Sequence, residues 1–294
     1  MKKVIVRIKG GLGNQLFCYA AARRLSLVNG AELVIDDVTG FVRDSLYHSK
    51  YLLDRFSISA RKATPAERLE PFERYRRGIN KLISRCKPFA NRFYVEQEGD
   101  DSDARILSLE VNKNLYLDGY WQSEDYFKDV EGVIRKDLRI TPPLDGPNQR
   151  MAEDIKNSCS VALHVRWFDA PDQAQVHNVA VDYYRRAIAF LEEKLKSPRY
   201  FVFSNDPEAA RKKIDLPESR VICVSHNKGN ENACADLWLM TLCRNFIIAN
   251  STFSWWGAWL AESDPAIVVV PNINVLGGAA WAQTNSIPCR WVRI

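Results

Sequence analysis

Several features that would place the chain in a special class are missing from its sequence. No run of about 18 apolar residues occurs among its 294 residues, which excludes a membrane-spanning helix. The N-terminus has only residues 4–6 apolar before Arg7, too short for a signal peptide, so we expect a first strand there. The seven cysteines are odd in number and lack CxxC or other metal spacing, which is typical of reduced thiols in a cytoplasmic protein. With 46% hydrophobic residues the chain is globular.

The positive charge is concentrated in one segment. The net charge is +5, yet residues 61–92 hold ten Lys and Arg against three Glu. No recognised nucleic-acid motif accompanies these cations, so we expect no nucleic-acid partner. Two interpretations stay open for this basic segment. One is a solvated helix, and the other is peripheral contact with an anionic membrane surface or a lipid-phosphate acceptor at the inner membrane face.

The order of apolar runs predicts two α/β halves. The first half opens with a strand at 2–9, a glycine turn, a helix at 14–28 and a strand at 31–37. A strand is expected at 115–120 and a helix at 123–136. The segment 139–150 carries three prolines and a glycine and is the best linker, which gives domains 1–147 and 148–294.

The second half alternates regularly between strands and helices. Apolar strands are expected at 161–165, 200–205, 220–225, 246–250 and 266–272, with helices at 182–195, 206–214, 232–245 and 252–262. Near-continuous apolar strands separated by helices indicate a parallel sheet covered on both faces. Two Rossmann-like, doubly wound domains that face each other across a cleft are therefore the expected architecture.

A glycine turn follows the first strand, in the sequence GGLGNQLF at residues 10–17. Gly11 and Gly13 let the backbone approach a ligand at the N-terminus of the next helix. The pattern nearly matches the dinucleotide fingerprint, and Asp36 follows where a ribose partner would lie. Leu16 occupies the third glycine position, where a side chain disturbs helix–strand packing. An NAD-dependent oxidoreductase therefore stays open as an alternative, as does a simple tight turn.

A second cluster, LHVRWFD, ends a buried strand of the second half. His164 and Arg166 are two residues apart and so point to one side, at the sheet edge where α/β proteins bind ligands. The guanidinium group matches phosphate oxygens. The alternative is an ion pair between Arg166 and Asp169, with His164 as a core residue.

Two further clusters fall at strand ends of the same half. Asn250, Ser251 and Thr252 begin a helix, with Ser254 in its first turn, and such helix starts bind phosphate. Asp206 ends another strand and could accept hydrogen bonds from guanine or ribose. The alternative for both clusters is helix capping, with the tryptophans of residues 255–259 in the core.

Taken together, these motifs resemble the α-1,2-fucosyltransferases, a glycosyltransferase family common in bacterial surface-polysaccharide synthesis. The matching segments are GGLGNQLFCYAAARRL, GYWQSEDYF, HVRWFD, FVFSND and IIANSTFSWWGAWL, which extend from Val4 to about Pro271. The family usually reads HVRRGDY, whereas this chain has Trp167 and Phe168 in place of the second Arg and the Gly. This departure affects the shape of the loop beside the donor, and it favours an altered acceptor or donor sugar.

The resemblance implies a GT-B-like fold, with an acceptor-side N-terminal domain and a C-terminal domain that binds GDP-fucose. It implies that Arg166 contacts the β-phosphate, assisted by the helix that starts near Ser251, in a reaction that needs no metal or other cofactor. The donor-binding set is Gly11, Gly13, His164, Asp206, Asn250, Ser251, Thr252 and Ser254. A DxD motif at 101–103 would argue for Mg²⁺ or Mn²⁺, but it lies in a polar loop.

The implied reaction inverts the anomeric carbon by a single displacement onto a galactose-containing oligosaccharide or a lipid-linked glycan. Deprotonation of the acceptor hydroxyl needs a base, for which Asp169 is the first candidate and Asp37 and His164 are weaker ones. Asn14 on the glycine turn is expected to hydrogen-bond sugar or phosphate. The expected product is an α-1,2 linkage. A related GDP-6-deoxyhexose as the donor, another linkage, and a catalytically inactive binding protein remain as alternatives.

Overall fold

The computed structural model describes residues 1–42, 44, 48–97, 103–168, 178–262, 267–272 and 287–294. The chain forms two compact units, Met1–Arg139 and Ile140–Ile294. Both are α/β units with parallel sheets, as the alternation of apolar runs predicts. None of the helices in the described ranges combines the length and apolar character that crossing a bilayer requires.

The first unit is built on a five-stranded sheet in the order β3-β2-β1-β5-β4. Its helices and strands are β1 (Lys3–Arg7), α1 (Leu12–Val28), β2 (Glu32–Asp36), β3 (Arg61–Lys62), α2 (Glu73–Arg85), β4 (Tyr94–Glu96), β5 (Asn114–Asp118) and α3 (Glu131–Asp137). Short 3-10 helices lie at Leu53–Arg55, Phe89–Asn91, Ala104–Ser108, Glu124–Tyr126 and Lys128–Val130. Val4 of β1 is in register with Leu33 of β2 and Leu115 of β5, so the central strand is buried between parallel neighbours.

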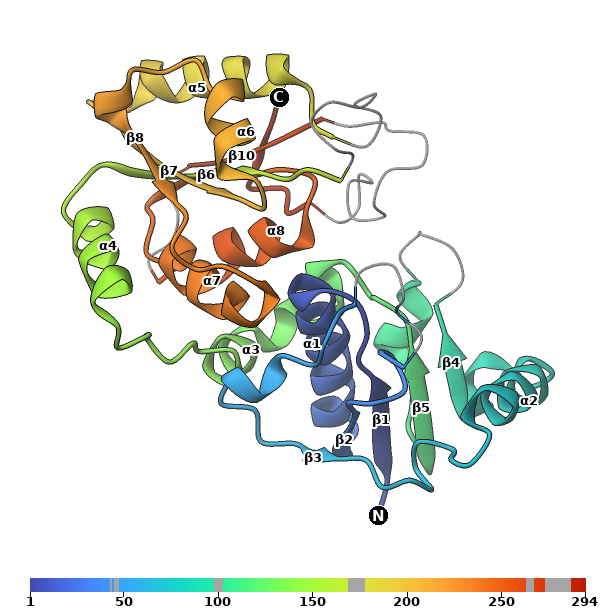
Figure 1. Cartoon of the computed structure of the whole chain (residues 1–294). Helices are drawn as coiled ribbons and strands as arrows, with labels where there is room; N and C mark the ends of the chain where they lie inside the picture. The colour runs from blue at the N-terminus through green and yellow to red at the C-terminus, as the bar shows by residue number, and fades with distance from the viewer. Residues whose placement is uncertain (43, 45–47, 98–102, 169–177, 263–266, 273–286) are drawn as a thin grey trace. The chain divides into compact units, whose positions relative to one another are not determined.

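The second unit is built on a six-stranded sheet in the order β11-β10-β9-β6-β7-β8. Its elements are α4 (Gly146–Lys156), β6 (Ser160–Val165), α5 (Val181–Lys194), β7 (Arg199–Ser204), α6 (Pro207–Lys213), β8 (Val221–Val224), α7 (Ala233–Thr241), β9 (Asn245–Ile247), α8 (Thr252–Trp259), β10 (Ile267–Val270) and β11 (Val292–Arg293), with 3-10 helices at Glu218–Arg220 and Asn230–Asn232. Figure 1 shows this sheet between α5 and α6 on one side and α7 and α8 on the other.

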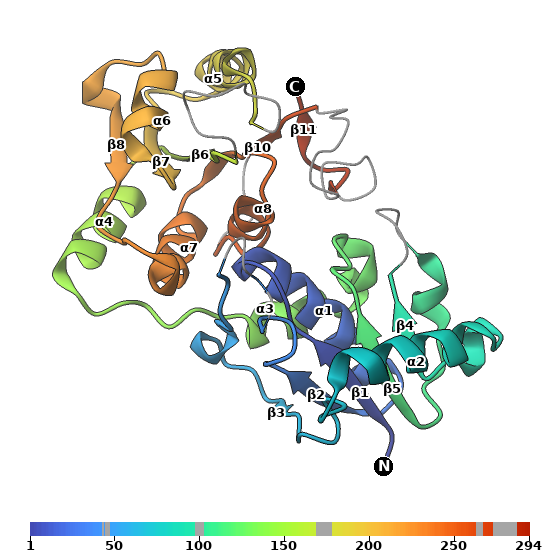
Figure 2. The ribbon, with the colours of Figure 1, turned by 45° about the vertical axis from the view of Figure 1, so that its right-hand side comes forward.

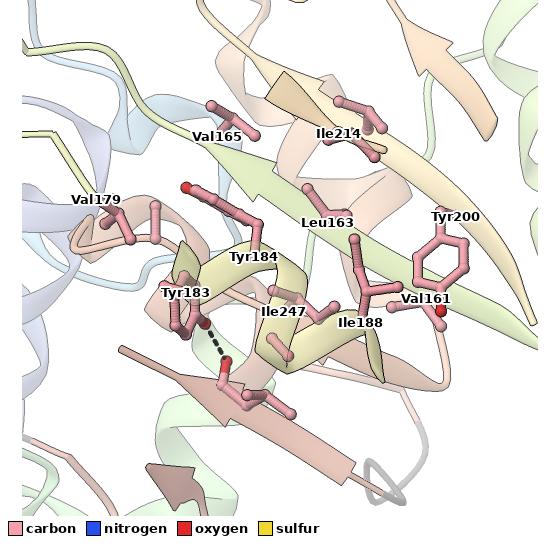
Figure 3. Packing of buried hydrophobic residues seen from close by; sticks show 14 of the residues in the cluster. Val161, Leu163, Val165, Val179, Tyr183, Tyr184, Ile188, Tyr200, Ile214 and Ile247 are labelled. Atoms are coloured by element: carbon pink, nitrogen blue, oxygen red, sulfur yellow. Dashed lines mark hydrogen bonds between the residues drawn. The ribbon is translucent and has the colours of Figure 1, made fainter. Parts of the chain in front are cut away.

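One hydrophobic core cluster of the second unit lies between the sheet and α5. Figure 3 shows the apolar side chains of β6 and β9 packed against this helix, with Tyr183 and Tyr184 among them. The hydroxyl of Tyr183 donates to the backbone carbonyls of Ile248 and Val269, at 2.7 and 3.0 Å. These bonds join α5 to the ends of two strands and satisfy a polar atom that burial would otherwise penalise.

The helix predicted at 123–136 begins later than expected. Two 3-10 turns precede α3, which starts only at Glu131. Phe127 between the turns has φ −151° and ψ 4°, outside the helical region, and its side chain is fully buried. Burial of the ring in the core thus overrides local helix propensity.

The boundary between the units lies at Arg139, earlier than the predicted division at 147/148. The difference arises because Gly146 and Pro147 begin α4 and do not belong to a linker. Asp145 caps this helix, since its carboxylate accepts from the backbone N–H of Asn148 at 3.0 Å. Proline is well tolerated at the first helical positions because it needs no backbone donor there.

Candidate functional site

His164 and Ser254 join β6 to α8 at the carboxyl edge of the second sheet. His164 Nδ1 lies 2.8 Å from Ser254 Oγ, and this hydroxyl donates to the backbone carbonyl of Ser251 at 3.2 Å. The direction of the bond between the imidazole and this hydroxyl is set by the tautomer of His164. Burial, with Arg166 adding to it, lowers the pKa of His164 to about 3. The ring is therefore neutral at physiological pH and provides no positive charge for a phosphate.

Arg166 follows the end of β6, on the loop that carries the unusual Trp167 and Phe168. The guanidinium carbon lies 5.3 Å from the centre of the Phe168 ring, and the arginine is half-buried. The backbone N–H of Phe168 donates to Asn178 Oδ1 at 2.6 Å. Asn205 bonds both backbone groups of Trp167, accepting at 3.0 Å and donating at 3.1 Å. Trp167 and Phe168 are thus held by two asparagines that motif reasoning did not select.

Lys213, at the end of α6, also supports this loop. Its ammonium group lies 4.5 Å from the ring centre of Trp167 and 5.4 Å from that of Tyr184, and it donates to the carbonyl of Val179 at 2.5 Å. Burial lowers the pKa of Lys213 to about 8. No local sequence signal could identify this lysine, since its partners are brought together only by the fold.

The start of α8 places the predicted cluster at the same edge. Ser251 is the N-cap residue, yet its side chain makes no capping bond to the helix in the described structure. Asn250 and Ser251 are buried, with exposed fractions of 2% and 9%, and Thr252 begins the helix. The tryptophans of this segment are in the core, as expected, with Trp255 stacked parallel to Trp259. The first amides of α8 therefore remain suited to an anion.

Asp206 behaves as the capping alternative predicts. Its Oδ1 accepts from the backbone N–H of Ala209 at 2.9 Å, and it is the N-cap of α6. Ser204 Oγ further fixes this turn, since it accepts from the backbone N–H of Asp206. A role for this carboxylate in donor binding remains a prediction.

The acid that we expected to act as base, Asp169, lies outside the described residues. Of the two weaker candidates, His164 has a pKa too low for efficient proton abstraction near neutrality. Asp37 forms an ion pair with Lys62 at 3.3 Å.

The glycine turn of the first unit leaves open space beside the start of α1. Gly10 has φ +74°, and a Cβ there would lie 2.9 Å from Asn14 Nδ2, so glycine is required. A Cβ added to Gly11, the N-cap of α1, would meet nothing within 4 Å. Gly13 is buried in the first helical turn. The backbone at Gly11 is thus accessible to a ligand.

Asn14 is held by a residue from the end of the neighbouring strand. Gln122 donates from Nε2 to Asn14 Oδ1 at 2.8 Å, which leaves the Nδ2 amide of Asn14 as the donor that it can offer. Gln122 is 9% exposed, and its Oε1 has no hydrogen-bond partner within the described residues. Close by, Lys9 donates to Asp118 at 2.7 Å and lies 4.9 Å from the Tyr120 ring centre. Polar groups that suit a sugar therefore gather at this edge.

Asp36 does not serve as the ribose partner of a dinucleotide. The residue is fully buried, and Oδ1 accepts from the backbone N–H groups of Val38 and Thr39. Oδ2 accepts from the hydroxyls of Thr39 and Tyr116. With both oxygens used inside the fold, Asp36 anchors the loop after β2, and the oxidoreductase alternative loses its acidic residue.

The C-terminal unit contains a half-buried carboxylate, Asp236, that was not identified from the sequence. Asp236 on α7 accepts from Asn227 Nδ2 at 2.9 Å, and burial raises its pKa to about 6 although this hydrogen bond opposes the shift. Asn227 also donates to Asn148 Oδ1, which lies 3.0 Å from His226 Nε2. This network joins α4, α7 and the segment after β8.

The described residues contain no group of three or more His, Cys, Asp or Glu side chains that could hold a metal ion. Of the DxD motif, only Asp103 is described. It accepts from the backbone and the side chain of Arg105, at 2.7–3.1 Å. The Asp103 carboxylate is thus already hydrogen-bonded to Arg105.

Comparison with known proteins shows the family. The model of glycosyl transferase family 11 matches residues 3–275. An α-1,2-colitosyltransferase of Escherichia coli is 30% identical over 308 residues, which cover 100% of this chain and 99% of that protein. The galactoside α-(1,2)-fucosyltransferase 1 of Bos taurus is 28% identical over 162 residues, covering 51% of this chain and 44% of that protein.

A solved structure supports the same fold. The crystal structure of the α-1,6-fucosyltransferase NodZ, soaked with GDP-fucose, superposes with a TM-score of 0.51 at 16% identity. The match covers 90% of this chain and 97% of NodZ. The GT-B-like class expected from the sequence is thus confirmed.

Proposed function

The chain belongs to glycosyl transferase family 11, and we propose that it transfers L-fucose from GDP-fucose to a hydroxyl of galactose in a glycan, forming an α-1,2 linkage. The main support for this proposal is that the groups suited to bind an anion lie at one edge of the second sheet. Arg166 and the start of α8 lie at neighbouring strand ends, β6 and β9, and the His164–Ser254 bond ties them together. The names of the colitosyl and fucosyl relatives support the donor class and the linkage.

In the proposed mechanism the acceptor oxygen attacks C1 of fucose while the bond from C1 to the β-phosphate oxygen breaks. GDP leaves with the electron pair, and the acceptor proton passes to a base, for which Asp169 remains the candidate. Arg166 and the α8 amides bind the growing charge on the β-phosphate, so no metal ion is required. Neutral His164 positions Ser254 and thereby the start of α8. Asn14, oriented by Gln122, offers its amide N–H to the sugar or phosphate.

A titration with GDP, GDP-fucose, UDP-galactose and NAD tests the donor. We expect GDP and GDP-fucose to bind much more tightly than the other two. Mass spectrometry of reactions with galactose-containing oligosaccharides then gives the product and its linkage. Affinity for UDP-galactose equal to that for GDP-fucose would refute the assignment, and binding without any turnover of GDP-fucose would favour the inactive binding protein.

A second donor is favoured by the comparison with the colitosyltransferase, which extends over the whole chain. Colitose is L-fucose without its 3-hydroxyl group, so the two donors differ by one hydrogen-bonding group. A site that hydrogen-bonds this hydroxyl rejects the deoxy sugar by roughly 10⁴–10⁵, whereas an apolar pocket discriminates by only about 10². Comparison of kcat/KM for GDP-fucose and GDP-colitose distinguishes the two proposals.

We propose a peripheral location for the enzyme at the inner membrane face, through the basic segment 61–92. This location would place the active site near a lipid-linked acceptor. The charge of the segment supports the proposal, since anionic lipids attract clustered Lys and Arg.

A further inference from the structure

Helix α2 presents its apolar residues to solvent. Five large apolar side chains are exposed on it, including its N-cap residue, with exposed fractions between 49% and 73%: Phe72, Tyr75, Ile79, Leu82 and Ile83. At 3.6 residues per turn these positions fall within an arc of about 100°. They form one continuous stripe, which we call the α2 stripe. An apolar face of this kind is normally turned toward the core of a soluble domain.

The opposite, polar face of α2 holds the helix to the sheet. Ser84 is fully buried, donates to the carbonyl of Tyr94 at 2.8 Å and accepts from the N–H of the same residue at 3.1 Å. Lys81 forms an ion pair with Glu96, also on β4. Figures 1 and 2 both show α2 next to β4. The helix is therefore inverted relative to an ordinary surface helix, since polar contacts fix it and its apolar stripe is left uncovered.

The charge around the α2 stripe indicates what kind of partner fits it. The helix carries five Lys and Arg and a single acidic residue, Glu73. Arg74 and Arg76 are exposed beside the stripe. Apolar and aromatic side chains flanked by cations are the pattern of helices that lie in the interface of an anionic bilayer. A second copy of the same chain would bring like charges together around the stripe, which opposes self-association.

We infer that α2 lies in the plane of an anionic phospholipid surface, with the α2 stripe inserted among the lipids and the flanking arginines on headgroup phosphates. With 13 residues the helix is about 20 Å long, shorter than the hydrocarbon core of about 30 Å, so it rests on the surface and does not span it. The inference rests on the membrane contact proposed for segment 61–92 and adds insertion of the stripe to it. It is independent of which sugar is transferred.

Co-sedimentation of the full chain with vesicles tests the inference. We expect binding to vesicles of phosphatidylethanolamine with phosphatidylglycerol and little binding to phosphatidylcholine alone. A stripe variant, Tyr75→Ser with Ile79→Ser and Leu82→Ser, should lower the partition coefficient at least tenfold because three apolar side chains are no longer buried. The control Leu144→Ser, which removes an apolar side chain that is 93% exposed elsewhere, should change it less than twofold.

A charge variant separates insertion from simple attraction. Arg74→Gln with Arg76→Gln should weaken binding roughly fivefold for each arginine at low salt. The difference between this variant and the wild type should fade as salt rises, whereas the loss in the stripe variant should persist. If the charge variant alone loses binding, the membrane contact stands and insertion of the stripe is wrong.

Two other outcomes would overturn the inference. One is absence of vesicle binding by the wild type, which would also remove the proposed membrane contact. The other is self-association of the wild type in sedimentation velocity, lost in the stripe variant, without vesicle binding; the stripe would then be an interface between copies. Turnover of a small soluble acceptor, measured for every variant, reports on the proposed transferase chemistry separately and should stay within about twofold.

Discussion

Replacement of Arg166 by alanine separates a catalytic role from a structural one. The cation is half-buried and follows β6, whose neighbour β9 leads into α8. If it binds the leaving β-phosphate, it stabilises the transition state more than the substrate. Removal of one preorganised donor typically costs 10²–10³ in kcat, or about 2.7–4 kcal/mol. We expect Arg166→Ala to lose at least this factor.

The expected cost in stability is smaller and follows from the contact with Phe168. A cation beside an exposed ring contributes about 0.5–1 kcal/mol, and the ring here is 40% exposed. In a chain of this size about 1 kcal/mol corresponds to roughly 2–4 °C in Tm. The alanine variant should therefore melt only a few degrees lower. Phe168→Leu, which removes the same ring contact and keeps the cation, should show a similar shift in Tm with kcat within about tenfold.

Both quantities are measured on the same preparations, with kcat at saturating GDP-fucose and Tm by scanning calorimetry. Arg166→Lys should recover little activity because an ammonium group cannot reproduce the bidentate contact of guanidinium with phosphate. The reasoning is refuted if Arg166→Ala lowers Tm by more than about 10 °C while kcat of the folded fraction stays within tenfold. Arg166 would then be a structural cation that holds the end of the strand.

Four further predictions concern the metal, two titratable groups of the C-terminal unit and Gln122 of the N-terminal unit. Turnover should persist in excess EDTA; loss that Mn²⁺ restores would show a metal-dependent reaction. The pKa of His164 is about 3 in the folded protein, below the usual 6.5, so the unfolded chain takes up a proton first as the pH falls. The free energy of unfolding should therefore drop by up to about 5 kcal/mol between pH 6.5 and 3. Urea unfolding midpoints of His164→Gln should lack this drop. Burial raises the pKa of Asp236 to about 6, so its ionisation should lower the free energy of unfolding by up to about 3 kcal/mol as the pH rises from about 4 to above 6. The stability of Asp236→Asn should not change over this range. A variant with the same pH profile as the wild type would contradict the burial of this carboxylate. Gln122→Leu should raise KM or lower kcat about tenfold through Asn14, and the isosteric Gln122→Glu should lose at least as much, because its carboxylate cannot donate to Asn14 Oδ1 and would draw away the amide N–H that Asn14 offers; wild-type activity in both variants would contradict the positioning role.

Much of the fold could be predicted because local apolar runs carry the information. Strands such as β6 and β7 are nearly continuous apolar segments, and their ends carry polar residues that mark the binding edge. The start of α8 and Arg166 were identified in this way. The helix predicted at 123–136 was wrong in its first half, since α3 begins only at Glu131; burial of Phe127 in the core is a tertiary effect that local sequence does not show.

The supporting contacts of the site could not be predicted because they join residues distant in sequence. Asn205 bonds the backbone of Trp167, and Gln122 bonds Asn14, across 38 and 108 positions. Neither Asn205 nor Gln122 stands out in the sequence by composition or by spacing. The inverted orientation of α2 was equally hidden, since periodicity reveals an apolar face but not the direction in which it points.

The structure accounts for how the loop after β6 tolerates the loss of the family's second arginine. Trp167 turns toward α5 and α6, where Lys213 covers its ring and Asn205 holds its backbone. These contacts fix Trp167 without any help from a guanidinium group at that position. Phe168, by contrast, is exposed and lies against Arg166. A change in donor or acceptor preference is therefore expected from Phe168, whereas phosphate binding by Arg166 is compatible with the substitution.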